Sequence, residues 1–105
     1  MSSSRDYLHF TLEQLAGLEG LRWRAMMGEY VLYVQDKVVG GVYDDRLLVK
    51  PTAAAMAMLP DAARELPYEG AREMLLVDRM EDAAFLKTLL AAVAAELPAP
   101  KRRRT

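Results

Sequence analysis

The sequence contains no cysteine and one histidine, and both scarcities exclude classes of site. Without cysteine there is no disulfide framework, no thiolate zinc site and no cysteine nucleophile, and the composition is typical of a protein kept in the reducing cytoplasm. A single histidine, His9, argues against a histidine metal site and against a Ser-His-Asp triad. We therefore expect no metal and no catalytic residues.

Long apolar runs and glycine-rich phosphate loops are also missing. No segment approaches the roughly 18 to 20 apolar residues that span a bilayer, and residues 1–10 lack a signal-peptide core. Gly40 and Gly41 lie within a strand pattern, open no helix and are not followed by Lys-Ser or Lys-Thr, so they predict no nucleotide site. Within a strand they indicate either a bulge or a place where another element's backbone or a bulky side chain packs closely. These absences predict a cytoplasmic protein with no membrane contact and no cofactor.

Charge is divided unevenly along the chain. The net charge of -1 includes a basic C-terminal run, and without its four positive charges the remainder carries -5. The run consists of Lys101, Arg102, Arg103 and Arg104. With 105 residues, 52% of them hydrophobic, we expect one domain over residues 1–99 and a disordered basic tail over 100–105. Nucleic-acid affinity comes mainly from clustered Lys and Arg, so only the tail has the right sign.

The clearest pattern lies in residues 21–43, where side chains alternate between apolar and polar. Alternation with a period of two predicts three consecutive antiparallel strands, with turns at Gly28 and at residues 36–37. Trp23 falls on the face that we assign to the helices. We expect it to be largely buried, so that Trp23→Ala would cost about 3 to 5 kcal/mol.

The remaining chain adds helices and two further strands around this meander. The pattern predicts a helix to about residue 16 capped by Ser3 or Ser4, a strand over 46–50, a helix capped by Thr52 and running to residue 59, and an irregular segment over 61–70. It also predicts a strand over 72–78 in a central position of the sheet, because its middle is continuously apolar, and a helix over 81–97. The order α-β-β-β-β-α-β-α predicts a two-layer α+β domain with a mainly antiparallel five-stranded sheet and helices on one face. Apolar residues on both faces of the second and third strands also predict a homodimer through the uncovered face or an edge.

Several segments together resemble the TfoX N-terminal domain family, which is associated with the regulation of bacterial competence (DNA-uptake) genes. They read RAMMGEYVLY from Arg24, GGVYDDRLLVKP, MLPDA, ELPYEGAREMLLV and LPAPKRRR, and they cover nearly the whole chain. In long members the first motif reads R-x-M-F-G-G-Y-G-L-Y, whereas Met27, Glu29 and Val31 replace Phe, Gly and Gly here. The resemblance implies a secretion-chaperone-like α+β fold, no established catalytic residues, and a stand-alone member without the C-terminal domain of long members.

Candidate interaction residues gather in and around the meander. They are Arg24, Met26, Met27, Glu29, Tyr30, Asp44 and Asp45. The first hypothesis is a non-catalytic regulatory domain that binds an unknown protein partner. Two alternatives stay open: a weak, non-specific nucleic-acid binder acting through the tail, and a small-ligand protein built on Arg24, Tyr30 and Asp44. The acidic residues also have a plain structural explanation, since Asp44 and Asp45 suit an ordinary turn.

Overall fold

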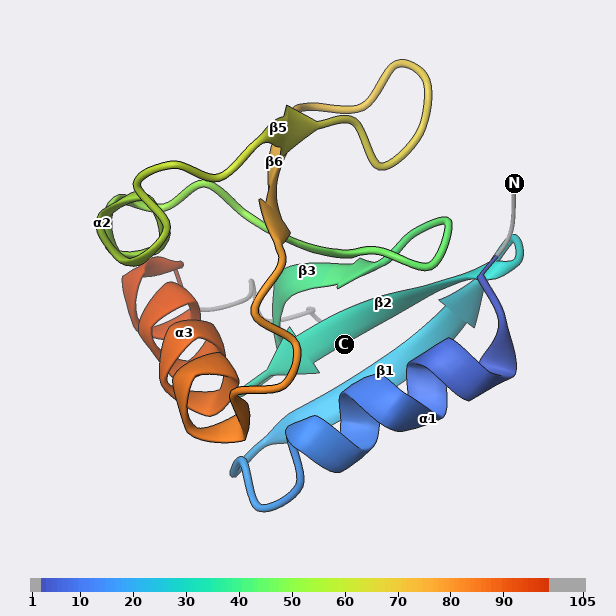
Figure 1. Ribbon diagram of the computed structural model, residues 1–105, viewed down its shortest axis with the longest axis horizontal. Helices are drawn as coiled ribbons and strands as arrows, with labels where there is room; N and C mark the ends of the chain where they lie inside the picture. Colours follow the sequence, from blue (N-terminus) through green and yellow to red (C-terminus); the bar gives the residue numbers. More distant parts are fainter. Residues whose placement is uncertain (1–2, 99–105) are drawn as a thin grey trace, which may run out of the picture.

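The computed structural model describes residues 3–98, which form three α-helices and six β-strands (Figure 1). In chain order the elements are α1 (Arg5–Gln14), β1 (Leu21–Met26), β2 (Glu29–Val34), β3 (Lys37–Val42), β4 (Leu47–Val49), α2 (Ala53–Met58), β5 (Arg64–Glu65), β6 (Met74–Val77) and α3 (Ala83–Glu96). No helix within the described stretch is both long and apolar enough to cross a membrane.

Each helix begins at a capping residue. The side-chain oxygens of Ser4, Thr52 and Asp82 each accept a hydrogen bond from the backbone N–H three residues further on, which satisfies a donor that the first helical turn leaves unpaired. The caps expected at Ser4 and Thr52 are thereby confirmed. Helix α1 ends at Gln14, earlier than expected, because the chain turns toward Gly17, whose φ is 92°.

Three tight hairpins join the first four strands, which pair antiparallel in sequence order. Their two-residue turns lie at 27–28, 35–36 and 44–45, and all six residues have positive φ. Positive φ at both central positions is the signature of a type I′ turn, whose twist matches that of the flanking strands. The second turn was expected at 36–37 but lies one residue earlier, because Lys37 already pairs with Val34.

The sheet has six strands rather than the five expected, in the order β1-β2-β3-β4-β6-β5. The additional strand, β5, lies in the segment predicted to be irregular and pairs with the outer side of β6. Arg46, just before β4, forms an ion pair with Glu65 of β5 and so ties this strand to the sheet. Two residues are too few to show an alternation, which is why the sequence did not reveal β5. Strand β6 occupies the interior position expected for it.

The helices pack on one face of this sheet, as the α+β prediction required. The main core combines side chains of all three helices with those of β2, β3, β4 and β6. Its largest fully buried members are Leu8, Leu15, Leu32, Leu47, Leu86, Leu89, Leu90, Val39, Val42, Val49 and Val93. Figure 1 shows α1 running along β1, with α2 and α3 side by side at the other end of the molecule. The fold class is confirmed.

The second face of the sheet is less open than the sequence suggested. A small second core forms there from Tyr43, Leu48 and Met74. The segment between β5 and β6 lies against it: Pro67 is buried, and the ring of Tyr68 lies 6.2 Å from that of Tyr43. Residues distant in sequence thus supply the cover that we expected from a second subunit over this part of the face.

Trp23 is not buried, contrary to expectation. It does lie on the helix-bearing face, where its ring meets that of Tyr30 edge to face at 5.7 Å. However, β1 is an edge strand, and 43% of the Trp23 surface remains exposed. The face was assigned correctly, but the edge position of the strand could not be read from the alternation.

Candidate functional site

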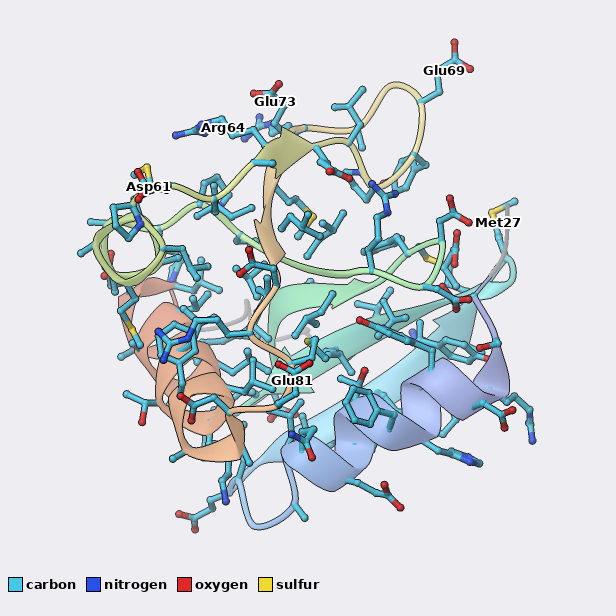
Figure 2. The ribbon with its side chains drawn as sticks, in the orientation of Figure 1. Met27, Asp61, Arg64, Glu69, Glu73 and Glu81 are labelled. Carbon is cyan, nitrogen blue, oxygen red and sulfur yellow. The ribbon has the colours of Figure 1, made fainter. Side chains whose placement is uncertain are left out.

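The β1–β2 hairpin presents exposed apolar side chains at its tip. Met27 is 96% exposed and Met26 is 40% exposed. Figure 2 shows Met27 at the periphery of the molecule, projecting from the turn. Met27 also has φ 53°, a left-handed conformation that costs a non-glycine residue roughly 1 to 2 kcal/mol. A large apolar residue thus occupies a position that favours Asn or Gly, with no packing inside the chain to offset the cost.

The acidic candidates Glu29, Asp44 and Asp45 lie close together next to this hairpin. The carboxylates of Glu29 and Asp45 and the backbone N–H groups of Asp44 and Asp45 are all hydrogen-bonded within the chain. One Glu29 carboxylate oxygen accepts hydrogen bonds from the Ser3 hydroxyl at 2.6 Å and from the Asp44 N–H at 3.1 Å. The Asp45 N–H donates to the Ser3 hydroxyl at 3.0 Å, and the Ser4 N–H donates to the Asp45 carboxylate at 2.8 Å. This network fastens the start of the chain to two hairpins. Sequence reasoning grouped the carboxylates correctly and missed their serine partners, which are distant in sequence.

Arg24 and Tyr30 do not share a site. In the β1–β2 ladder Arg24 pairs with Val31, while Tyr30 pairs with Ala25. Directly paired residues point to the same face and successive residues point to opposite faces, so Arg24 and Tyr30 lie on opposite sides of the sheet. Tyr30 is 9% exposed and belongs to the main core. The alternative hypothesis of a small-ligand site built on Arg24, Tyr30 and Asp44 is therefore wrong.

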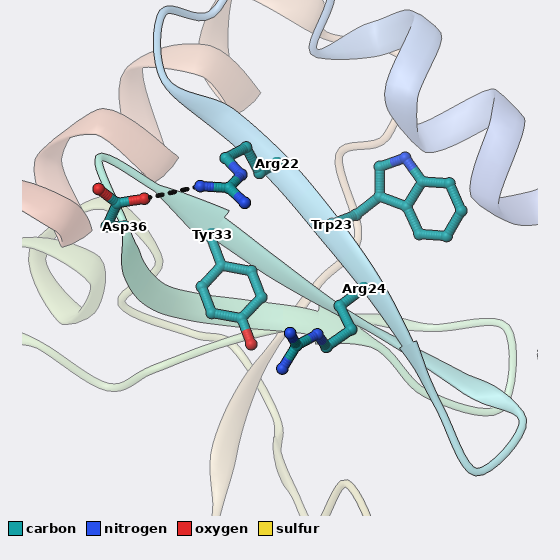
Figure 3. Close-up of a pocket in the computed structure, with 5 residues that line it drawn as sticks. All are labelled: Arg22, Trp23, Arg24, Tyr33 and Asp36. Carbon is teal, nitrogen blue, oxygen red and sulfur yellow. Dashed lines mark hydrogen bonds and ion pairs between the residues drawn. The ribbon is translucent and has the colours of Figure 1, made fainter. Parts of the chain in front are cut away.

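Arg24 instead lines a hollow on the second face of the sheet. Figure 3 shows Arg22 and Arg24 on either side of Tyr33, with the Tyr33 hydroxyl directed toward the Arg24 guanidinium. The hollow has a volume of about 180 Å³. Arg22 is paired with Asp36 at 3.0 Å, and both side chains are exposed. Within residues 3–98 Arg24 forms no ion pair. The alternation that places Arg22, Arg24 and Tyr33 on one face can be read from the sequence, but Arg22 and Tyr33 were not among the predicted site residues.

A larger groove of about 690 Å³ lies on the same face, between the strands and the segment over 66–73. Its floor includes Tyr43, whose ring lies on Gly41 so closely that a Cβ there would come within 2.7 Å of the ring. Burial raises the pKa of Tyr43 above its ordinary value, and the neighbouring Tyr68 and Glu29 raise it further. The sequence marked Gly41 as a place where a bulky side chain packs closely, and this is confirmed, whereas the groove itself was not foreseen.

Other candidate groups give no further site within the described part of the chain. Residues 3–98 contain no group of three or more His, Cys, Asp or Glu side chains placed to hold a metal ion. His9 is exposed on α1. The basic run Lys101, Arg102, Arg103 and Arg104 lies outside the described residues.

Comparisons with known proteins match nearly the whole chain. The family model of the TfoX N-terminal domain matches residues 13–94, which include the β1–β2 hairpin, every strand and most of α3. An uncharacterized 12.7 kDa protein in the trpE 5′ region of Spirochaeta aurantia is 38% identical over 105 residues, covering 99% of this chain and 91% of the relative. No solved structure gives a significant match.

Proposed function

The chain belongs to the TfoX N-terminal domain family, as its motifs indicated, and from this premise we propose that it is a regulatory protein-interaction domain related to competence regulators. In this proposal it acts by binding a protein partner rather than by catalysis, and the contact centres on the tip of the β1–β2 hairpin. Membership of the family supports the regulatory role, and the exposed side chains at the hairpin tip support the choice of binding surface.

The observation that carries the proposal is Met27. Its side chain is 96% exposed, so it contributes little to the core, and its backbone is in the left-handed region. An Asn at this position, followed by Gly28, would form a more stable turn. Methionine is flexible and polarizable, and it is common on surfaces that adapt to a partner. Its presence at a strained and exposed turn is explained if a bound partner covers it.

Crosslinking inside cells tests this surface. A photoreactive phenylalanine analogue at position 27 should give a defined adduct with a partner protein after irradiation. The same analogue at Thr88, which is exposed on α3, is the matched control and should give none. Equal crosslinking from both positions, or none from position 27, would contradict the proposal.

A genetic measurement tests the regulatory part. A strain that lacks the protein should show changed transcript levels of its DNA-uptake genes. The wild-type chain should restore them, and a chain with Met27→Asn should not. Because this variant is expected to be at least as stable as the wild type, its failure would reflect lost binding rather than unfolding. Transcript levels that do not respond to loss of the protein would remove the link to competence.

A further inference from the structure

Strand β1 leaves one of its long sides unpaired at the edge of the sheet. The Gln35 N–H donates to the Gly20 carbonyl at 3.1 Å, which extends the β1–β2 ladder by one pair. Hydrogen bonding alternates along an antiparallel pair, so the even-numbered residues of β1 bond to β2. The N–H and C=O groups of Trp23 and Ala25 therefore point outward. Within residues 3–98 no other segment bonds to them.

This edge is open to solvent along nearly its whole length. Five of the six residues of β1 are exposed, and only Leu21 is partly covered. Figure 3 shows the Trp23 ring between β1 and α1. An open strand edge pairs readily with another extended segment, and proteins normally shorten, cover or charge such edges. On β1 the edge is charged, by Arg22 and Arg24.

The two faces of this edge differ in chemistry. Arg22 and Arg24 point to the second face, where Arg24 has no ion-pair partner in the described stretch. Trp23 and Ala25 point to the helix-bearing face, and the Trp23 ring is partly uncovered. A segment that pairs with β1 would need acidic side chains on one face and apolar side chains on the other.

A second copy of this chain does not meet that requirement. In antiparallel pairing about a two-fold axis at Trp23, Arg22 of one copy would lie opposite Arg24 of the other. With the axis at Arg24, the two Arg24 side chains would lie opposite each other. Like charges placed directly across two strands are destabilising, so the arginines oppose self-pairing in both of these registers.

We propose that the β1 edge accepts an extended segment of a partner protein in which acidic and apolar residues alternate. The backbone groups of Trp23 and Ala25 bond to the incoming strand, a mode of recognition in which main-chain bonds give affinity and alternate side chains give specificity. Its acidic side chains meet Arg22, Arg24 and the Tyr33 hydroxyl, and its apolar side chains cover Trp23. This inference specifies the partner contact of the proposed function and therefore rests on it.

A synthetic peptide tests the pairing directly. The probe has four Val-Glu repeats and blocked ends, and the control peptide has four Val-Lys repeats. Trp23 is the single tryptophan of the chain, so its fluorescence reports binding at the edge. The Val-Glu peptide should change that fluorescence saturably and shift the amide NMR signals of Trp23 and Ala25, whereas the Val-Lys peptide should do neither. No binding of the Val-Glu peptide would overturn the proposal.

Two variants separate strand pairing from general charge attraction. Ala25→Pro removes an outward N–H without removing a bond to β2, and proline is tolerated at such edge positions. It should weaken binding about tenfold or more, because the added strand loses a main-chain bond. Arg24→Glu should weaken binding of the Val-Glu peptide by about tenfold and strengthen binding of the Val-Lys peptide. The new carboxylate repels the glutamates of the first peptide and attracts the lysines of the second.

Arg64→Glu is the matched control, because it makes the same charge change on β5, at the opposite edge of the sheet. It should leave the affinity of both peptides nearly unchanged. Equal losses from Arg24→Glu and Arg64→Glu, or binding that survives Ala25→Pro, would show general electrostatic attraction and overturn the strand-pairing mode. If position 27 still crosslinks a partner while the peptide does not bind, the strand-pairing inference fails and the proposed function stands.

Discussion

At the scale of single residues, the unusual feature is a set of non-glycine residues with left-handed backbone. Met27, Gln35, Asp36, Asp44 and Asp45 all have φ between 53° and 65°. Asn, Asp and Gly are the residues that type I′ turns prefer, so the aspartates fit and Met27 does not. The first hairpin therefore forms although Met27 is unfavourable in its turn. Replacing Met27 by a residue that prefers this backbone conformation should raise the stability of the protein.

Met27→Asn should stabilise the protein by about 0.5 to 1 kcal/mol, a part of the roughly 1 to 2 kcal/mol that a left-handed non-glycine residue costs. It creates the Asn-Gly pair that type I′ turns favour, and it removes an exposed side chain that lies outside the core. Urea denaturation measures the gain as a rise in the midpoint, with the dependence of the unfolding free energy on urea concentration unchanged. Met26→Asn, on extended backbone, is the control and should give no gain. A Met27→Asn protein less stable than the wild type would show that Met27 contributes to folding.

Tyr43 should limit stability at alkaline pH. Its pKa is raised in the folded state by burial and by Tyr68 and Glu29, above an unfolded value of about 10. The folded state therefore binds the phenolic proton more tightly, so this contribution is complete below about pH 10 and is lost as pH rises through the folded pKa. The unfolding free energy should fall above pH 10, and Tyr43→Phe should reduce the fall. An unchanged pH profile in Tyr43→Phe would assign the alkaline loss to other groups.

At the scale of elements, the edge position of β1 governs the role of Trp23. A fully buried tryptophan replaced by alanine costs about 3 to 5 kcal/mol, but nearly half of this side chain is exposed. We expect Trp23→Ala to cost about 1 to 2 kcal/mol, mainly through lost contact with Tyr30. Leu32→Ala, at the fully buried neighbour on β2, should cost more and serves as the comparison in the same urea titrations. A loss above about 3 kcal/mol for Trp23→Ala would mean that the helices cover it in solution.

At the scale of the whole molecule, the homodimer stays a prediction with a narrower basis. The segment over 66–73 covers Tyr43 and Met74, so a face-to-face contact would have to use the half-buried Tyr33, Val38 and Leu76. Sedimentation equilibrium at tens of micromolar should then give twice the 11.8 kDa chain mass. Val38→Glu should return the mass to that of one chain, because it places a charge in the contact. A wild-type mass near 11.8 kDa would contradict the dimer.

The charge division along the chain gives a second prediction at this scale. A protein shortened after Pro100 should keep its thermal midpoint, and any retention on DNA should disappear, since the remaining chain carries -5 without the four basic residues. Replacing those four residues by glutamine keeps the length and should abolish retention equally. Retention that survives both changes would place nucleic-acid binding on the folded domain.

The amino-acid sequence by itself determined the features that depend on near neighbours. Capping at Ser4 and Thr52, the alternation in β1 to β3, the turn at Gly28 and the apolar stripe of α3 are each settled within a few residues. The order of elements followed from these, and so did the α+β class. The grouping of the acidic turn residues near the hairpin could also be predicted, because hairpin ends return to the same side of a meander.

The tertiary structure alone decided which strand lies at the edge and what covers each face. Strand order placed β1 outermost, which exposed Trp23 and left the Trp23 and Ala25 backbone unpaired. Pairing register put Arg24 and Tyr30 on opposite faces, and the segment over 66–73 covered Tyr43. Each outcome depends on packing between residues far apart in the chain, which local alternation and composition do not encode.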